Sequence, residues 1–156
     1  MFHALIVFVM EGNKKYVCIE DYALIVADWH QFDRALWEKI VVSLEGLTKL
    51  VGISASRMDT QLFLGNYKIT PFGVHVDAAS AFHFPIIGKK IIRFWPDSYA
   101  QKNPALHHAR NYARFLENSS VIKAVPGQAI YWPSNYWHIG EGDGTLIEEI
   151  IFLFSP

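Results

Sequence analysis

A histidine and an aspartate stand two residues apart in the stretch TPFGVHVD, residues 70–77. Side chains at positions i and i+2 of a β-strand point to the same face, so His75 and Asp77 can both reach one metal ion if this stretch is extended. Seven histidines give roughly a one-in-three chance of some His-x-Asp pair in such a chain, and short motifs carry that risk. Taken alone, the pair is more often a surface or hydrogen-bonded pair than a pair of ligands.

A third candidate ligand, His138, lies among tryptophans and tyrosines in PGQAIYWPSNYWHIG, residues 126–140. It is either a core histidine or a ligand. Two histidines and one carboxylate on one face leave coordination positions open, as in non-haem Fe(II) oxygenases, although the same donors suit a catalytic zinc ion. For most of the neighbouring rings, at Trp132, Tyr136 and Trp137, we expect core packing.

A lysine is expected to be buried in IIGKKIIRFW, residues 86–95, interpreted as one strand. Alternation places Lys90 on a face with Ile86, Gly88, Ile92 and Phe94. Burying a lysine there is costly without an anionic partner. Lys90 is either structural, as a lysine that snorkels to solvent or pairs with a carboxylate of the protein, or it holds the far carboxylate of a bound dicarboxylic acid. The pattern leaves both interpretations open.

Short strands must position these residues. Paired strands are expected at 2–10 and 15–20 around a turn at 11–13, followed by a strand at 22–27. Hydrophobic residues four apart predict a helix over 30–46, begun by Asp28 or Asp33 and ended by Gly46. A helical insertion is predicted at 103–117. Further strand-like runs are 60–69, 73–78, 81–96, 120–125, 128–133, 136–140 and 145–154.

This pattern predicts a mainly β fold: a double-stranded β-helix, or jelly roll, with added N-terminal strands and one or two helices. The length of 156 residues suits a single domain, 1–156. Within it we expect N-terminal strands and a helix at 1–58, and a jelly-roll core at 59–156 with the insertion at 103–117.

Composition narrows the class of protein. Hydrophobic residues make up 51% of the chain, which is typical of a globular protein, and the net charge of −1 without a basic run argues against nucleic-acid binding. The single cysteine, Cys18, excludes an internal disulfide and fits a cytoplasmic protein. The apolar N-terminal run is too short to span a bilayer, so no membrane association is expected. The oligomeric state is left open.

Three ordered motifs resemble those of the Jumonji-C (JmjC) oxygenases, a branch of the cupin superfamily. They are TPFGVHVD, FHFPIIGKKIIRFWPDSY and VPGQAIYWPSNYWHIG. The spacing from His75 to Lys90 matches, without a gap, that of the asparaginyl hydroxylase of hypoxia signalling, whereas TPFGVH is more similar to the histone-demethylase branch. The resemblance covers about residues 60–154. No chromatin-reader module or cysteine cluster accompanies it, which argues against a histone demethylase.

The resemblance implies a jelly roll that holds Fe(II) through His75, Asp77 and His138. It implies 2-oxoglutarate as cosubstrate, with its 5-carboxylate on Lys90. Phe72 matches a position that lines the 2-oxoglutarate pocket, and Tyr67 is a further hydroxyl donor to that carboxylate. The implied activity is that of an Fe(II)- and 2-oxoglutarate-dependent dioxygenase that hydroxylates a peptide, protein side chain or small metabolite and releases succinate and CO2.

The sequence departs from the family pattern in two places. Ala81 stands where relatives often carry an asparagine near the cosubstrate, and the run 145–154 lacks a polar residue that some relatives use. Two alternatives therefore stay open. One is a metal-dependent cupin enzyme that does not use 2-oxoglutarate, with Lys90 structural. The other is a catalytically inactive jelly-roll binding protein.

Overall fold

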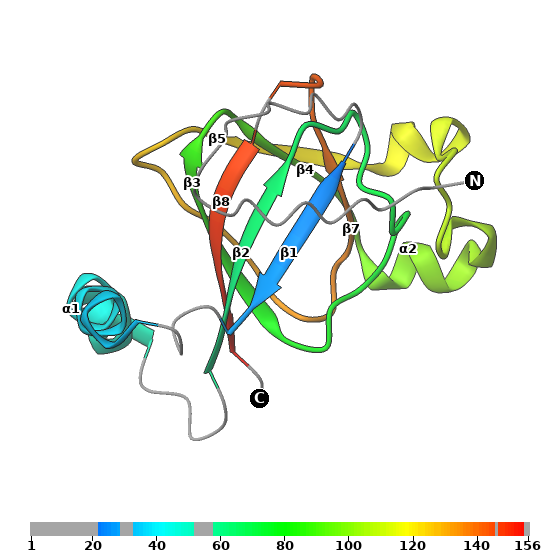
Figure 1. Ribbon diagram of the computed structural model, residues 1–156. Coiled ribbons are helices and arrows are strands. Elements are labelled where there is room, and N and C mark those ends of the chain that lie inside the picture. The colour runs from blue at the N-terminus through cyan, green and yellow to red at the C-terminus, as the bar shows by residue number, and fades with distance from the viewer. Residues whose placement is uncertain (1–21, 29–32, 52–57, 146, 155–156) are drawn as a thin grey trace.

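The computed structural model describes residues 22–28, 33–51, 58–145 and 147–154. Its strands form two antiparallel sheets, one of five strands in the order β1-β2-β8-β3-β6 and one of three in the order β5-β4-β7 (Figure 1). The bounds of the first sheet are β1 Ala23–Ala27, β2 Met58–Gly65, β8 Ile147–Phe154, β3 Ser80–Ile87 and β6 Ile130–Trp132. Those of the second are β5 Ser120–Ala124, β4 Lys90–Trp95 and β7 Trp137–Glu141.

The core lies between the two sheets. In β3 and β4 buried residues alternate with partly exposed ones, so each strand turns one face inward. Phe63, Ala81 and Ile151 of the larger sheet and Ile92 and Phe94 of the smaller one belong to one buried cluster. This two-sheet arrangement is a jelly roll, and the predicted fold class is confirmed.

The chain passes from one sheet to the other at Gly88. This residue has φ +79°, in the left-handed region that favours glycine, and it separates β3 from β4. The expectation of one continuous strand over 86–95 is therefore wrong. Alternation holds only inside β4, where Lys90 is buried, whereas Ile86, before the turn, is 44% exposed.

Helix α1 (Arg34–Val51) begins after Asp33, one of the two predicted caps, and it both begins and ends later than the expected span of 30–46. The Asp33 carboxylate accepts a hydrogen bond of 2.9 Å from the Ala35 N–H, which satisfies one of the free donors at the start of the helix. Gly46 does not end the helix, contrary to the expected span of 30–46. A glycine ends a helix where it turns left-handed, and Gly46 is not among the positive-φ glycines.

The predicted helical insertion at 103–117 is broken into short pieces. Helix α2 spans Asp97–Lys102, and the 3-10 turns η2 and η3 span Pro104–Leu106 and Ala113–Asn118. A single helix is excluded because His108 has φ +58°. The Trp95 indole N–H donates 2.9 Å to the Phe115 carbonyl, which ties η3 to the end of β4. In Figure 1, α1 and α2 lie on opposite sides of the sheets.

The expected strand at 22–27 is present as β1. The strands expected at 2–10 and 15–20, with their hairpin turn, lie outside the described residues. A search of the described helices for a bilayer-spanning segment finds none of sufficient length and hydropathy.

Candidate metal centre

The segment that carries His75 runs beside β7 instead of forming a regular strand. Isolated bridges join Ile69 to Glu141 and His75 to His138. The His75 N–H donates 2.9 Å to the His138 carbonyl, and the His138 N–H donates 2.7 Å to the His75 carbonyl. The prediction of a strand at 73–78 is therefore wrong, because the segment forms only an isolated bridge. This bridge to β7 nevertheless brings both histidines to one place.

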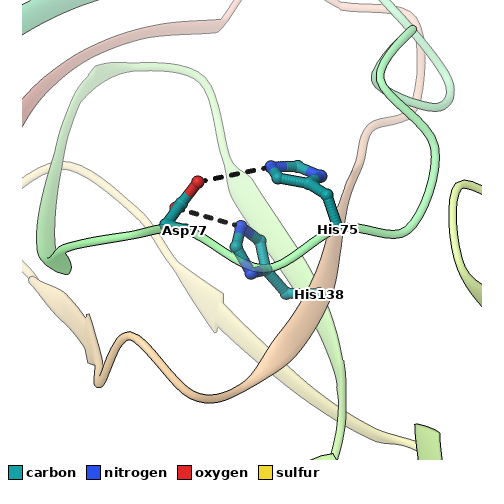
Figure 2. A group of neighbouring side chains, drawn as sticks. All are labelled: His75, Asp77 and His138. Carbon is teal, nitrogen blue, oxygen red and sulfur yellow. Dashed lines mark ion pairs between the residues drawn. The ribbon is translucent and has the colours of Figure 1, made fainter. Parts of the chain in front are cut away.

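His75, Asp77 and His138 converge. Each offers a ligand atom, and these atoms lie within 4.8 Å of one another. The His75 Nε2 atom lies 3.6 Å from one carboxylate oxygen of Asp77, and the His138 Nε2 atom lies 3.4 Å from the other (Figure 2). When metal–ligand bonds are about 2.1 Å long, ligand–metal–ligand angles between a right angle and the tetrahedral angle separate the ligand atoms by about 3.0–3.4 Å. The three side chains can therefore hold a metal ion.

Hydrogen bonds at the far side of each ring determine which nitrogen faces the aspartate. The His75 Nδ1 atom lies 2.9 Å from the Gly73 carbonyl, and the His138 Nδ1 atom lies 3.1 Å from the Tyr136 carbonyl. A carbonyl only accepts, so each Nδ1 carries a proton. A neutral ring then turns the Nε2 lone pair toward a carboxylate, an arrangement that requires a cation between them, either a proton or a metal ion. Metal-bound histidines show the same outer hydrogen bond.

At His75 the electrostatics favour the metal ion over the proton. Burial, followed by the neighbouring charge of His138, lowers the pKa of His75. Burial alone would raise the pKa of Asp77, but the hydrogen bond and charge of His138 outweigh it and the pKa is lowered. At neutral pH the group therefore presents an ionised carboxylate, and at His75 a neutral imidazole, both in the state that binds metal.

The triad opens onto a cavity of about 130 Å³. Such a volume is small beside the roughly 300–1,000 Å³ of drug-sized pockets, so it suits a compact ligand. Phe72 lies on the wall, 47% exposed, with its ring centroid 5.8 Å from that of His75. Other polar or aromatic residues on the wall are Gln61, Phe63, Thr70, His83, Lys90 and Trp132.

Lys90 lies on the cavity wall and already has an anionic partner. Its ammonium forms a short ion pair with Glu149 of β8, and donates 3.3 Å to the hydroxyl of Tyr67. Its Nζ atom also lies 4.7 Å from the ring centroid of Phe63. The protein-carboxylate partner considered from the sequence is thus observed. Tyr67 contacts Lys90, as a shared carboxylate site would require, but it does not line the cavity itself.

Two members of this charged cluster, His83 and Glu149, were not assigned a role from the sequence. Because β3 and β4 belong to facing sheets, the side chains of His83 and Lys90 both turn inward. The His83 Nδ1 atom lies 3.0 Å from Glu149, and the His83 ring stacks on Trp132. Glu149 lies in the run that lacks the polar residue some relatives use, and it supplies a buried carboxylate there. Its place between Ile147 and Ile151 on the buried face was the available signal.

The cluster strongly stabilises the ionised form of Glu149. Burial would raise the pKa of Glu149, but the charges of Lys90 and then His83 lower it to about 2. The pKa of Lys90 is raised, because the Glu149 carboxylate outweighs the effect of burial. Burial is the largest cause that lowers the pKa of His83 and raises that of Tyr67, so both are neutral at pH 7.

A pH dependence of stability follows. The folded-state pKa of Glu149, about 2, lies below its ordinary value of 4.5. The ion pair therefore contributes fully above pH 4.5, and its contribution is lost as the pH falls toward 2. This difference in pKa corresponds to about 3 kcal/mol of unfolding free energy. Urea unfolding at pH 7, 5 and 3.5 should show this loss, and Glu149→Gln should flatten the profile. If the unfolding free energy of Glu149→Gln depended on pH as steeply as that of the native chain, this prediction would be wrong.

Comparison with known proteins identifies no family. No family model matches the sequence, and no curated protein matches it. A cupin superfamily protein from Desulfitobacterium hafniense is 13% identical, with 90% of this chain and 84% of that chain covered at a TM-score of 0.47. A variant of Bacillus subtilis oxalate decarboxylase is 11% identical, with 89% of this chain and 26% of that chain covered at a TM-score of 0.48.

A third similar structure is a cupin domain from Bordetella pertussis. It is 11% identical, with 67% of this chain and 88% of that chain covered at a TM-score of 0.42. TM-scores below 0.5 with such identities assign neither a family nor an activity. The description of the fold and the site therefore rests on the strand order and on the contacts of the chain itself.

Proposed function

We propose that this protein is an Fe(II)- and 2-oxoglutarate-dependent dioxygenase of the JmjC type, acting on a peptide, a protein side chain or a small metabolite. The observation that carries the proposal is the convergence of two Nε2 atoms and one carboxylate on the wall of a cavity. Two histidines and a carboxylate with open positions are the ligand set of non-haem Fe(II) oxygenases. Bound iron would supply oxygen activation and substrate oxidation.

The residues of the chain would divide the work of binding. His75, Asp77 and His138 would hold the metal ion, and the backbone carbonyls behind the two rings fix their orientation. Phe72 and Trp132 would limit the access of water to the cavity, which strengthens the electrostatic interactions inside it. The cytoplasmic location expected from Cys18 remains part of the proposal.

Donors for the far carboxylate of 2-oxoglutarate are available on the cavity wall. Lys90 has three N–H groups, of which two are directed to Glu149 and Tyr67, so one remains for a ligand. The Thr70 hydroxyl accepts a hydrogen bond of 3.3 Å from the Gly140 N–H and retains its own O–H to donate. Thr70, which the sequence reasoning overlooked, therefore joins Lys90 as a candidate cosubstrate contact.

The ion pair favours a second candidate, a metal-dependent enzyme that does not use 2-oxoglutarate. Glu149 neutralises Lys90, and a ligand carboxylate placed there would meet a second negative charge. In this case Lys90 and Glu149 stabilise the fold, and the open metal positions serve a substrate without a second carboxylate.

Anaerobic titration with Fe(II) and 2-oxoglutarate distinguishes the two candidates. The dioxygenase should develop the weak visible charge-transfer band of the chelate and form succinate when oxygen is admitted. Lys90→Ala at the same ligand concentration should lose the band. Iron binding without a band would reject 2-oxoglutarate and favour the second candidate, and absence of iron binding would reject both.

A buried donor on the wall gives a further prediction. The Trp132 indole N–H has no hydrogen-bond partner among the described residues, and the side chain is 2% exposed. A ligand oxygen can satisfy this donor, so Trp132→Phe should weaken 2-oxoglutarate binding about tenfold. Loss of an unsatisfied buried donor should also raise the unfolding free energy by about 1 kcal/mol. Calorimetric titration and urea unfolding test the two effects, and unchanged affinity would contradict the first.

A further inference from the structure

We propose that Glu149 is a specificity-determining residue that competes with the distal carboxylate of a ligand for Lys90. The native cavity therefore holds a dicarboxylate more weakly than its lysine would otherwise allow. The inference deepens the proposed function, on which it rests in placing a 2-oxo acid at the triad. It adds that Glu149 determines how strongly Lys90 prefers a negatively charged ligand.

The position of Glu149 supports an action through Lys90. The Glu149 side chain is fully buried and is not on the cavity wall, whereas Lys90 and His83 are. Each of its carboxylate oxygens is engaged, one by the Lys90 ammonium and the other by the His83 ring. A bound ligand would meet Lys90 first and would experience the Glu149 charge directly behind it.

The charges around the ammonium sum to zero. Lys90 is positive, Glu149 is negative, and Tyr67 and His83 are neutral at pH 7. The remaining charge on the wall, Asp77, is negative. A second carboxylate therefore finds no excess positive charge, although it finds a donor. Replacing Glu149 by glutamine keeps a hydrogen-bonding side chain of the same size and leaves the cluster with a charge of +1.

An unpaired buried lysine attracts a carboxylate strongly. Removal of one partner of a buried ion pair leaves an uncompensated charge, and any anion that restores the pairing is favoured by the same amount. The effect is limited to ligands that bring a carboxylate to Lys90, since an amide in the same place carries no charge. Glutarate and glutaramide, which differ in charge and not in length, are matched probes.

The experiment is a calorimetric titration of the metal-free full chain with glutarate and with glutaramide. Glu149→Gln should bind glutarate at least about tenfold more tightly than the native chain, with glutaramide affinity unchanged. The double variant Lys90→Met/Glu149→Gln should lose the gain. Glu141→Gln is the matched control, because Glu141 is also paired with a cation, Arg93, and Arg93, unlike Lys90, does not line the cavity.

Equal glutarate affinity in folded Glu149→Gln and native protein would overturn the inference, since a purely structural pair changes stability and not ligand affinity. Should Glu149→Gln not fold, Glu149→Asp retracts the carboxylate and should give a smaller gain in the same direction; no gain would again overturn it. The glutarate titration needs no metal. Failure of Fe(II) binding would therefore reject the proposed function and leave this result to decide the inference.

Discussion

Asp77→Asn is expected to lower Fe(II) affinity by at least about 100-fold, more than loss of an outer hydrogen bond does. The amide keeps the size of the carboxylate but removes the charge that the two Nε2 atoms face at 3.4 and 3.6 Å. Bound Fe(II) should raise the unfolding temperature of the native chain and not that of the variant, because a ligand that binds only the folded state stabilises it. Anaerobic Fe(II) titration and thermal unfolding with and without metal measure both effects.

The matched control for this prediction is His108→Asn. His108 has an exposed imidazole, its backbone N–H donates 2.7 Å to the Val74 carbonyl beside His75, and asparagine tolerates its φ of +58°. Its loss should leave Fe(II) affinity unchanged, although it removes one histidine as a chance surface ligand. If Asp77→Asn retained the native affinity, the metal would lie elsewhere and the candidate centre would be rejected.

Lys90→Met is expected to lower the unfolding free energy by about 3–5 kcal/mol, because it leaves Glu149 as an unpaired charge in the interior. The double variant Lys90→Met/Glu149→Met should recover at least half of this loss, since apolar side chains of similar size can replace a buried ion pair. Urea unfolding at pH 7 of the native chain, both single variants and the double variant gives the coupling between the two residues.

Lys89→Met provides the comparison at the neighbouring position. Its ammonium lies 3.6 Å from Asp143, and both side chains are about half exposed. Such a surface pair contributes about 0–1 kcal/mol, so the variant should unfold almost as the native chain does. Additive effects of Lys90→Met and Glu149→Met, without recovery in the double variant, would show that the pair is not energetically coupled.

Local patterns predicted much of the fold. β1 and the later strands were expected from alternation and turn residues, and Asp33 from its capping position. Patterns failed where a backbone conformation interrupts a run. Gly88 divides one apolar run into strands of different sheets, and His108 divides the helical insertion. Gly46, expected to end a helix, lies inside one because a glycine marks a helix end only where its φ turns positive.

The sequence by itself named His75, Asp77 and His138 as candidate metal ligands and showed that burial of Lys90 would need an anion, because these depend on residue type and on motif order along the chain. The tertiary structure alone decided the partner. Glu149 and Lys90 are 59 residues apart, and Glu149 and His83 are 66 apart. Contacts between strands of facing sheets depend on the register of elements distant in sequence, which local spacing does not encode. The convergence of His75 and His138 depends in the same way on the pairing of the His75 segment with β7.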